Sequence, residues 1–191
     1  MERLQNALKV LVEFNDDELE VISKLIEPIQ LHKGDFFSNP EKTCNILGFL
    51  NNGILRVYHL NDGKEVTDYF NTTDRNPFVS SFASFLNRRP SRQYVEALTD
   101  VEVLTISYTN LQNLYDSSKK FERIGRLLAE KNYLLNLERI ESLQYHDATK
   151  RYLSFLQLYP NLVNEIQNHY IASYLGVTAE SLSRIRRNLT K

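Results

Sequence analysis

Apolar residues along this chain follow two different spacings, and the spacing changes twice. In the first 26 residues they recur every three or four positions, as at Leu4 and Leu8, which predicts amphipathic helices. Asn15 or Asp16 is placed to cap a second helix that runs through Ile26, with acidic residues in its first turn. The chain therefore opens with two short helices.

From Ile29 the pattern changes to short runs rich in β-branched and aromatic residues, separated by turn signals. Asn61-Asp62-Gly63 is the strongest hairpin signal, and Lys33-Gly34-Asp35 and Asn51-Asn52-Gly53 are two others. Many short strands at regular spacing predict a β-sandwich or a rolled barrel, with a short helix at 78–86 inside the roll. The expected strands include residues 36–37, 46–50, 54–58, 66–70, 94–98 and 101–106.

The chain from Asn110 to about Gln144 predicts a single long helix, because it contains no proline and one glycine, Gly125. A helix of about 30 residues would be about 45 Å long, which is more than one small roll covers. One interpretation is a two-stranded coiled contact with a second copy of the chain, and the other is burial on its own domain. The apolar seam consists of Leu114, Phe121, Ile124, Leu128 and Leu135.

Two apolar stripes near the C-terminus predict two further short helices joined by a tight turn, after a third helix at about 147–158 that Pro160 ends. Gly176 ends the first of the two, since a left-handed conformation costs glycine little, and Thr178 can cap the second. This is the pattern of a helix-turn-helix, whose second helix lies in the DNA major groove. The stripes consist of Ile171, Ala172, Leu175, Leu182, Ile185 and Leu189.

Outward positions of that last helix carry groups suited to DNA. Arginine donates two parallel hydrogen bonds to guanine, and glutamate accepts from the cytosine amine, so Glu180 and Arg184, one turn apart, could read neighbouring bases. The alternative is an ordinary surface ion pair between these two residues. Hydroxyl and cationic groups around this face are expected to contact the DNA backbone. They are Thr178, Ser181, Arg187 and Lys191.

Composition narrows the class of protein. The chain has 191 residues, enough for one large or two small domains. Cys44 is the single cysteine, which excludes an intramolecular disulfide and favours a cytoplasmic protein. We expect no metal site or cofactor, because the histidines lack zinc spacing. We expect no enzyme, because no nucleophile–base set or phosphate loop occurs. No apolar run reaches the length of a membrane helix, and no secretory signal is recognisable.

Charge is unevenly distributed along the chain. From Asp147 onward six basic residues oppose three acidic ones, a net charge of +3, which leaves −4 on the preceding residues. A basic tail on an acidic body is typical of a small DNA-reading module attached to a regulatory domain.

The order of roll, long helix and helix-turn-helix, with Ile171-Ala172-x-x-Leu175-Gly176-Val177-Thr178-x-Glu180-Ser181-Leu182-Ser183-Arg184, resembles the Crp–Fnr superfamily of bacterial transcription regulators. The resemblance covers essentially the whole chain. It implies an α+β fold with a cyclic-nucleotide-binding-like roll at 1–109, a dimerisation helix at 110–146 and a winged helix-turn-helix at 147–191. It also implies a homodimer that binds near-palindromic double-stranded DNA, with RNA polymerase as a candidate further partner.

The resemblance also assigns individual residues. Glu180 and Arg184 match the family's base-contacting residues, and Ser183 matches a serine that reads DNA in the oxygen-sensing branch. Ala179 stands where the cyclic-AMP branch has an arginine, which favours a TTGA-type half-site.

The roll departs from the family's nucleotide-binding pattern. Ser80 and Ser81 stand where that branch has Gly-Glu, and Arg92 is displaced by one position from the phosphate-binding arginine, which on a strand reverses its face. We therefore expect no cyclic-AMP binding of the familiar kind. An unknown small-molecule effector, or none, remains open, and the tip at 88–92 reads as a solvated loop or an anion site. The aromatic residues of the roll form either part of its packed core or the lining of an effector pocket. The candidate pocket consists of Phe70, Ser80, Ser81, Arg92 and Tyr94.

The sequence thus predicts a homodimeric, sequence-specific transcription regulator. The alternative is a ligand-sensing or protein-interaction module that has lost DNA binding.

Overall fold

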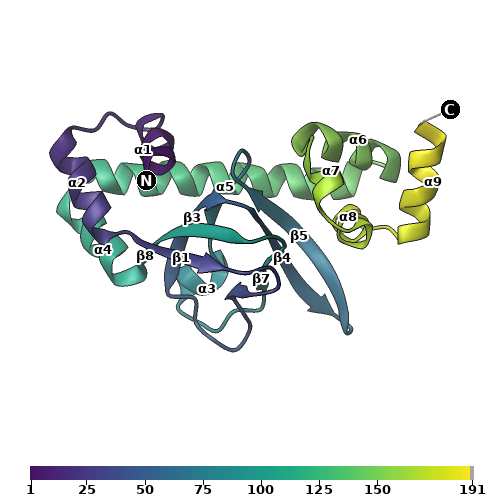
Figure 1. Cartoon of the computed structure of the whole chain (residues 1–191), viewed down its shortest axis with the longest axis horizontal. Helices are drawn as coiled ribbons and strands as arrows, with labels where there is room; N and C mark the ends of the chain where they lie inside the picture. The colour runs from purple at the N-terminus through teal and green to yellow at the C-terminus, as the bar shows by residue number, and fades with distance from the viewer. Residues whose placement is uncertain (190–191) are drawn as a thin grey trace. The chain divides into compact units, whose positions relative to one another are not determined.

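The computed structural model describes residues 1–189 and shows an α+β fold (Figure 1). The strands are β1 (Glu27–Leu31), β2 (Phe36–Ser38), β3 (Ile46–Asn52), β4 (Ile54–Asn61), β5 (Lys64–Thr72), β6 (Phe78–Val79), β7 (Tyr94–Ala97) and β8 (Val101–Ser107). The helices are α1 (Glu2–Lys9), α2 (Asp16–Leu25), α3 (Phe82–Asn87), α4 (Tyr108–Ser117), α5 (Lys119–Tyr145), α6 (Ala148–Leu158), α7 (Leu162–Glu165), α8 (Asn168–Leu175) and α9 (Ala179–Leu189).

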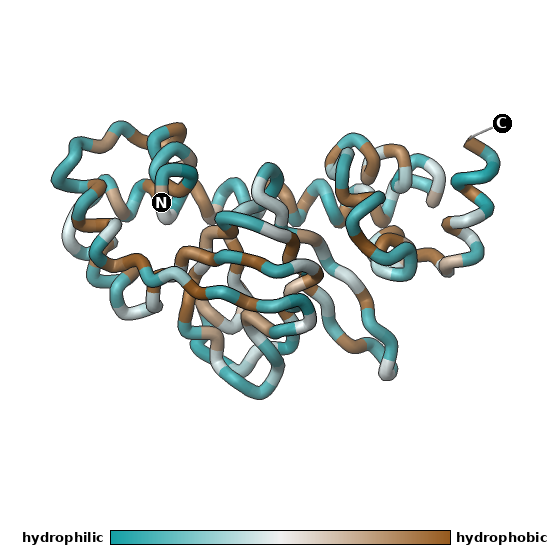
Figure 2. The backbone as a smooth tube through the Cα atoms, viewed as in Figure 1, coloured by the Kyte–Doolittle hydropathy of each residue, from teal (hydrophilic) through white to brown (hydrophobic). Residues whose placement is uncertain are grey.

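The strands form two four-stranded sheets, in the orders β1-β8-β3-β6 and β2-β7-β4-β5. β8 pairs antiparallel with β1 and with β3, and a register shift interrupts the β3–β8 ladder between Leu50 and Asn52. Figure 2 shows apolar residues concentrated along these strands. Leu50, Leu55, Val95 and Val103 are buried, so the roll has a packed apolar interior, as the sequence predicts.

The β4–β5 turn follows directly from its sequence. Asp62 and Gly63 have φ of 50° and 76° and are the two residues between the strands. Positive φ at both central positions is the type I′ geometry that matches the twist of a two-residue hairpin, and Asp-Gly is one of the few pairs that adopt it easily.

The long helix is shorter than expected. Ser118, with φ −161° and ψ 132°, separates α4 from α5, and Ser117 Oγ donates to Leu114 O at 2.7 Å. Ser118 Oγ accepts from Lys120 N at 3.2 Å. Adjacent serines supply local hydrogen bonds that compete with the helix, which explains why the expected single helix breaks here.

The chain divides into two compact units. The first comprises Met1–Val57 and Phe70–Asn132, which include most of the roll, the N-terminal helices and the first half of α5. The second comprises the β4–β5 hairpin at Tyr58–Tyr69 and the chain from Tyr133 onward. The division of 1–109, 110–146 and 147–191 stays a prediction about functional domains.

The predicted apolar seam has two environments. Leu114, Phe121 and Ile124 are buried in the first unit, which corresponds to the own-domain interpretation for this part of the helix. Further along α5 a different set of large apolar side chains is exposed. It consists of Tyr133, Leu134, Ile140, Leu143 and Tyr145.

Two further expectations require correction. Residues 78–79 form strand β6, so the helix expected at 78–86 begins only at Phe82. In the described part of the chain no strand follows Ser107, and the residues after it fold into helices, so the expected wing is not found between Tyr108 and Leu189.

Candidate nucleic-acid interface

The turn between α8 and α9 is built on Gly176. Its φ of 65° and ψ of 37° lie in the left-handed region, and a Cβ there would meet only Leu143 at 3.8 Å, so conformation rather than space favours glycine. Gly176 N donates to Ser173 O at 3.1 Å, and Val177 N donates to Ala172 O at 3.0 Å. This pair of bonds is the Schellman motif, which satisfies two terminal carbonyls and fixes the direction in which the chain leaves α8.

Thr178 directly precedes α9 and caps it, as predicted. Its Oγ1 accepts from Ser181 N at 3.2 Å, and its carbonyl accepts from Leu182 N at 3.0 Å. Thr178 Oγ1 also lies 3.1 Å from Ser181 Oγ, so the hydroxyls of two predicted DNA-backbone residues are already hydrogen-bonded to each other. Both lie at the N-terminal end of α9, where backbone N–H groups favour anions.

The faces of α9 separate apolar from polar residues. Leu182 and Ile185 are buried, as predicted, together with Ile171 and Leu175 of α8. Leu189 is 43% exposed, so its expected inward position is wrong. It lies in the last turn of α9, where the buried face of the helix ends.

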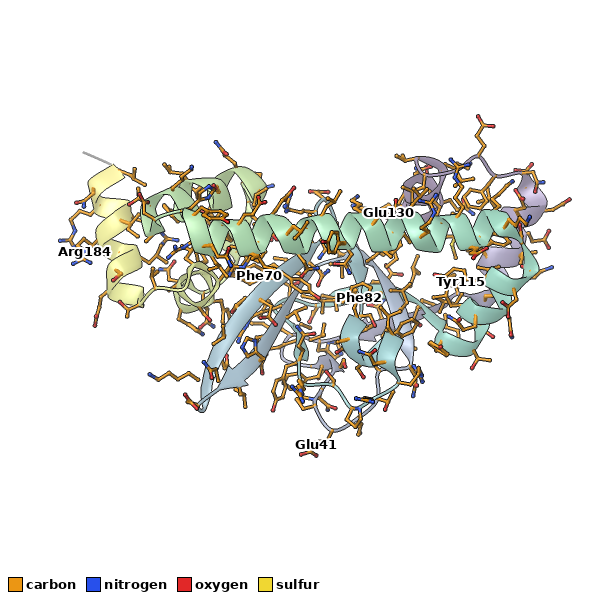
Figure 3. The ribbon with its side chains drawn as sticks, turned by 180° about the vertical axis from the view of Figure 1, so that it is seen from behind. Glu41, Phe70, Phe82, Tyr115, Glu130 and Arg184 are labelled. Atoms are coloured by element: carbon orange, nitrogen blue, oxygen red, sulfur yellow. The ribbon has the colours of Figure 1, made fainter. Side chains whose placement is uncertain are left out.

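The predicted base-reading residues share the solvent-exposed face. Glu180, Ser183 and Arg184 are all exposed, and the side chain of Arg184 points away from the neighbouring helices (Figure 3). Arg187 is also exposed, and Lys191 lies outside the described residues. No ion pair joins Glu180 to Arg184 within residues 1–189, so the alternative interpretation of this pair finds no support in the geometry.

Sequence reasoning missed the role of Arg186. Its Nε donates to Tyr152 Oη at 3.0 Å, and its Nη1 donates to Asn168 Oδ1 at 2.7 Å. The guanidinium also lies 5.4 Å from the centroid of the Tyr152 ring. Arg186 therefore ties α9 to α6 and α8, whereas the neighbouring Arg184 and Arg187 are exposed. The only signal in the sequence is that Arg186 lies four positions after the buried Leu182, which places both on one side of α9. This spacing does not identify the partners of Arg186.

Three of the candidate effector-pocket residues, Phe70, Ser80 and Ser81, are buried inside the roll. Phe70 and Ser80 are completely buried, and Ser80 Oγ donates to Ile46 O at 3.0 Å. Ser81 Oγ lies 2.8 Å from Ser91 Oγ, so it too has a protein partner. These hydroxyls are satisfied within the roll, which leaves them no requirement for a ligand.

The two remaining pocket candidates, Arg92 and Tyr94, are less buried than these serines. Arg92 is exposed, and Tyr94 contacts Phe36, with ring centroids 5.8 Å apart. Arg88 of the same loop donates to Cys44 O at 3.1 Å and lies 4.0 Å from the Tyr108 ring centroid, so it serves the packing of the roll. Arg89 and Arg92 fit the interpretation of a solvated loop tip.

The described residues offer neither a metal-binding cluster nor a membrane-spanning helix. Residues 1–189 contain no cluster of three or more histidine, cysteine or acidic side chains placed to hold a metal ion. None of their helices combines the length and the apolar character needed to cross a membrane.

Residues 28–118 match the family described as cyclic nucleotide-binding domain. No curated protein matches the sequence. FixK2 from Bradyrhizobium japonicum is similar in structure, with a TM-score of 0.73 and 19% identity over 86% of this chain and 84% of that one. A CooA mutant from Carboxydothermus hydrogenoformans has a TM-score of 0.70 and 19% identity over 96% and 83%. A Crp/Fnr-family regulator from Eubacterium rectale has a TM-score of 0.71 and 22% identity over 93% and 84%.

These matches confirm the resemblance found in the sequence, together with the α+β class, the roll and the long helix. At these identities the likeness to solved structures concerns the fold. Residues 28–118 thus match the cyclic nucleotide-binding domain family, and the chain has the fold seen in Crp–Fnr regulators.

Proposed function

We propose that this chain is a sequence-specific DNA-binding transcription regulator that acts as a homodimer. The observation that carries the proposal is the exposed face of α9, where Glu180, Ser183 and Arg184 stand together beyond a glycine turn and a threonine cap. In a helix-turn-helix this is the face that enters the major groove. Glu180 and Arg184 would read base edges, with Ser183 beside them.

The backbone contacts follow from the same arrangement. Thr178 and Ser181 at the start of α9 would contact one phosphate, and Arg187 would contact another. The positive charge of Lys191 would add a further phosphate contact. These contacts fix the register of the helix on the duplex and carry most of the salt dependence.

Dimerisation would place two such helices about 34 Å apart, in successive major grooves of a near-palindromic operator. The exposed apolar residues on α5 supply a surface for a second copy. RNA polymerase would be a further partner at promoters, and such a regulator works in the cytoplasm with the DNA.

The roll would sense an effector other than cyclic AMP bound in the familiar way, or none. A buried cyclic phosphate needs a paired cation and hydrogen-bond donors, whereas Ser80 and Ser81 are satisfied within the protein and Arg92 is exposed.

Selection of bound sequences from random double-stranded DNA tests the proposal directly. We expect enrichment of two inverted half-sites of the TTGA type, with centres one helical turn apart. If a folded dimer enriches no sequence, the proposal fails. That outcome would favour the alternative function, a ligand-sensing or protein-interaction module that has lost DNA binding.

Arg184→Ala tests the base-reading role. Loss of a bidentate contact to guanine should weaken binding to the selected operator by about 1–3 kcal/mol and relax the preference at one base pair. Fluorescence anisotropy titrations with the operator and single-base variants measure both effects. Arg89→Ala removes the same charge from an exposed loop of the roll and should change neither. Unchanged base preference in Arg184→Ala would refute the assignment.

Arg187→Ala separates phosphate contact from base reading. It should weaken binding to all sequences alike and reduce the slope of log K against log salt by about 1. A sequence-dependent loss in this variant would instead place Arg187 at a base.

A further inference from the structure

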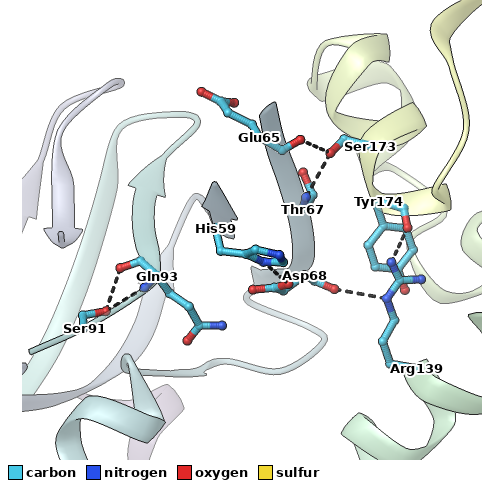
Figure 4. A network of polar contacts seen from close by, with 9 residues as sticks. All are labelled: His59, Glu65, Thr67, Asp68, Ser91, Gln93, Arg139, Ser173 and Tyr174. Carbon is cyan, nitrogen blue, oxygen red and sulfur yellow. Dashed lines mark hydrogen bonds and ion pairs between the residues drawn. The ribbon is translucent and has the colours of Figure 1, made fainter. Parts of the chain in front are cut away.

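The β4–β5 hairpin and helix α8 lie in one compact unit and are joined by Ser173. Its Oγ accepts from Thr67 N and donates to Glu65 O, each at 2.9 Å (Figure 4). β5 lies at the edge of its sheet, and Ser173 contacts the backbone of this edge strand at two points. One hydroxyl of α8 therefore takes the place of a neighbouring strand at this point.

Arg139 of α5 joins the same two elements. Its Nε donates to Asp68 O at 3.2 Å, and its Nη2 donates to Tyr174 O. The guanidinium lies 3.9 Å from the Tyr174 ring centroid. Burial lowers the pKa of Arg139, because removal from water disfavours the charged guanidinium.

Asp68 connects these contacts to the rest of the hairpin. While its carbonyl accepts from Arg139, its carboxylate lies 2.9 Å from His59 Nδ1 on β4 (Figure 4). Both strands of the hairpin are thus connected to Arg139 through Asp68.

A second arginine completes the end of α8. Arg151 Nε donates to Leu175 O at 2.8 Å, and its Nη1 donates to His146 O, just after α5, at 2.6 Å. The carbonyls of Tyr174 and Leu175 are thus held by guanidinium groups, at the helix end where the dipole favours cations. The two preceding carbonyls are used by the Gly176 turn. All four terminal carbonyls of α8 therefore have donors, and the hairpin is attached to this end.

We propose that Ser173 and Arg139 form a latch that couples the position of the β4–β5 hairpin to the orientation of α8, its turn and α9. The proposal rests on the proposed function. The latched state leaves Glu180, Ser183 and Arg184 exposed, so it is the DNA-binding state. Release of the latch lets α8 and the turn move, and only the latched fraction of molecules then binds the operator.

Ser173→Ala tests the latch, with Ser142→Ala on α5 as a matched control that removes a half-buried hydroxyl elsewhere in the same unit. Amide hydrogen exchange reads the contact itself: Thr67 N should lose protection in Ser173→Ala and keep it in the control. Operator affinity should fall about threefold to tenfold in Ser173→Ala and stay unchanged in the control. Because coupling is reciprocal, saturating operator should slow exchange at Thr67 in the unmodified protein.

The outcomes separate the two proposals. Unchanged protection of Thr67 in Ser173→Ala, or lost protection with unchanged operator affinity, overturns the latch and leaves DNA binding intact. Failure of the unmodified protein to select any DNA overturns the proposed function and the latch with it. Arg139→Gln serves as a second variant. It removes the charge that bridges Asp68 and Tyr174, and it should lower operator affinity in the same direction.

Discussion

Arg184 and Arg186 lie two positions apart on α9 and have opposite environments. Arg184 points into solvent (Figure 3). Arg186 instead donates to Tyr152 and Asn168. Hydrogen bonds from a charged group contribute more to stability than neutral ones do, so Arg186→Ala should lower the free energy of unfolding by about 1.5–3 kcal/mol. Arg184→Ala should change it by less than about 0.5 kcal/mol. Urea unfolding of the two variants measures both values.

The control for this comparison is DNA binding, in which Arg184→Ala and not Arg186→Ala should have the larger effect on base preference. Arg184→Ala should relax base preference, whereas Arg186→Ala should leave the preferred sequence unchanged even where affinity drops. Equal stabilities of the two variants would show that the contacts of Arg186 do not hold α9.

The predictable residues are those whose roles depend on their neighbours in the chain. Gly176, Thr178 and Asp62-Gly63 adopt the conformations expected from sequence because left-handed turns, caps and hairpins are local. Arg139 and Arg186 were not predictable in this way, since a long cationic side chain reads the same whether it faces solvent or bridges distant carbonyls and rings. The wing and the inward Leu189 came from extending a family pattern and a helical period too far.

At the scale of elements, the junction between α4 and α5 depends on Gly125. A Cβ at this position would lie 2.6 Å from Cζ and Oη of Tyr115, whose pKa is raised by burial. Gly125→Ala should therefore lower the free energy of unfolding by about 1–3 kcal/mol through overpacking, less the gain of about 1 kcal/mol that alanine brings to a helix. Thermal or urea unfolding measures the net loss.

The matched background is Tyr115→Leu, which withdraws the atoms that the new methyl group would meet. In that background Gly125→Ala should be neutral or stabilising by up to about 1 kcal/mol. The same loss in both backgrounds would mean that Tyr115 is not the reason for glycine at this position.

At the scale of the whole molecule, the second half of α5 exposes more apolar surface than a monomer needs. Leu134 is 58% exposed and Ile140 is 48% exposed, in a helix whose first half buries its apolar seam in the first unit. If a second copy covers this part of α5, Leu134→Arg combined with Ile140→Arg should give a monomer with an unfolding free energy within about 1 kcal/mol of the unmodified protein. Sedimentation equilibrium at micromolar concentration measures the change.

Loss of the dimer should also change DNA binding in a specific way. Two linked reading helices bind a palindrome with a high effective concentration for the second contact, so the monomer should bind the full operator at least about a hundredfold more weakly. Its affinity for an isolated half-site should be unchanged, because α9 is untouched. Gln144→Arg adds a charge at an exposed polar position of α5 and should leave both mass and operator affinity as they are. If the unmodified protein sediments as a monomer and still binds the palindrome as tightly as a dimer should, the dimer is refuted.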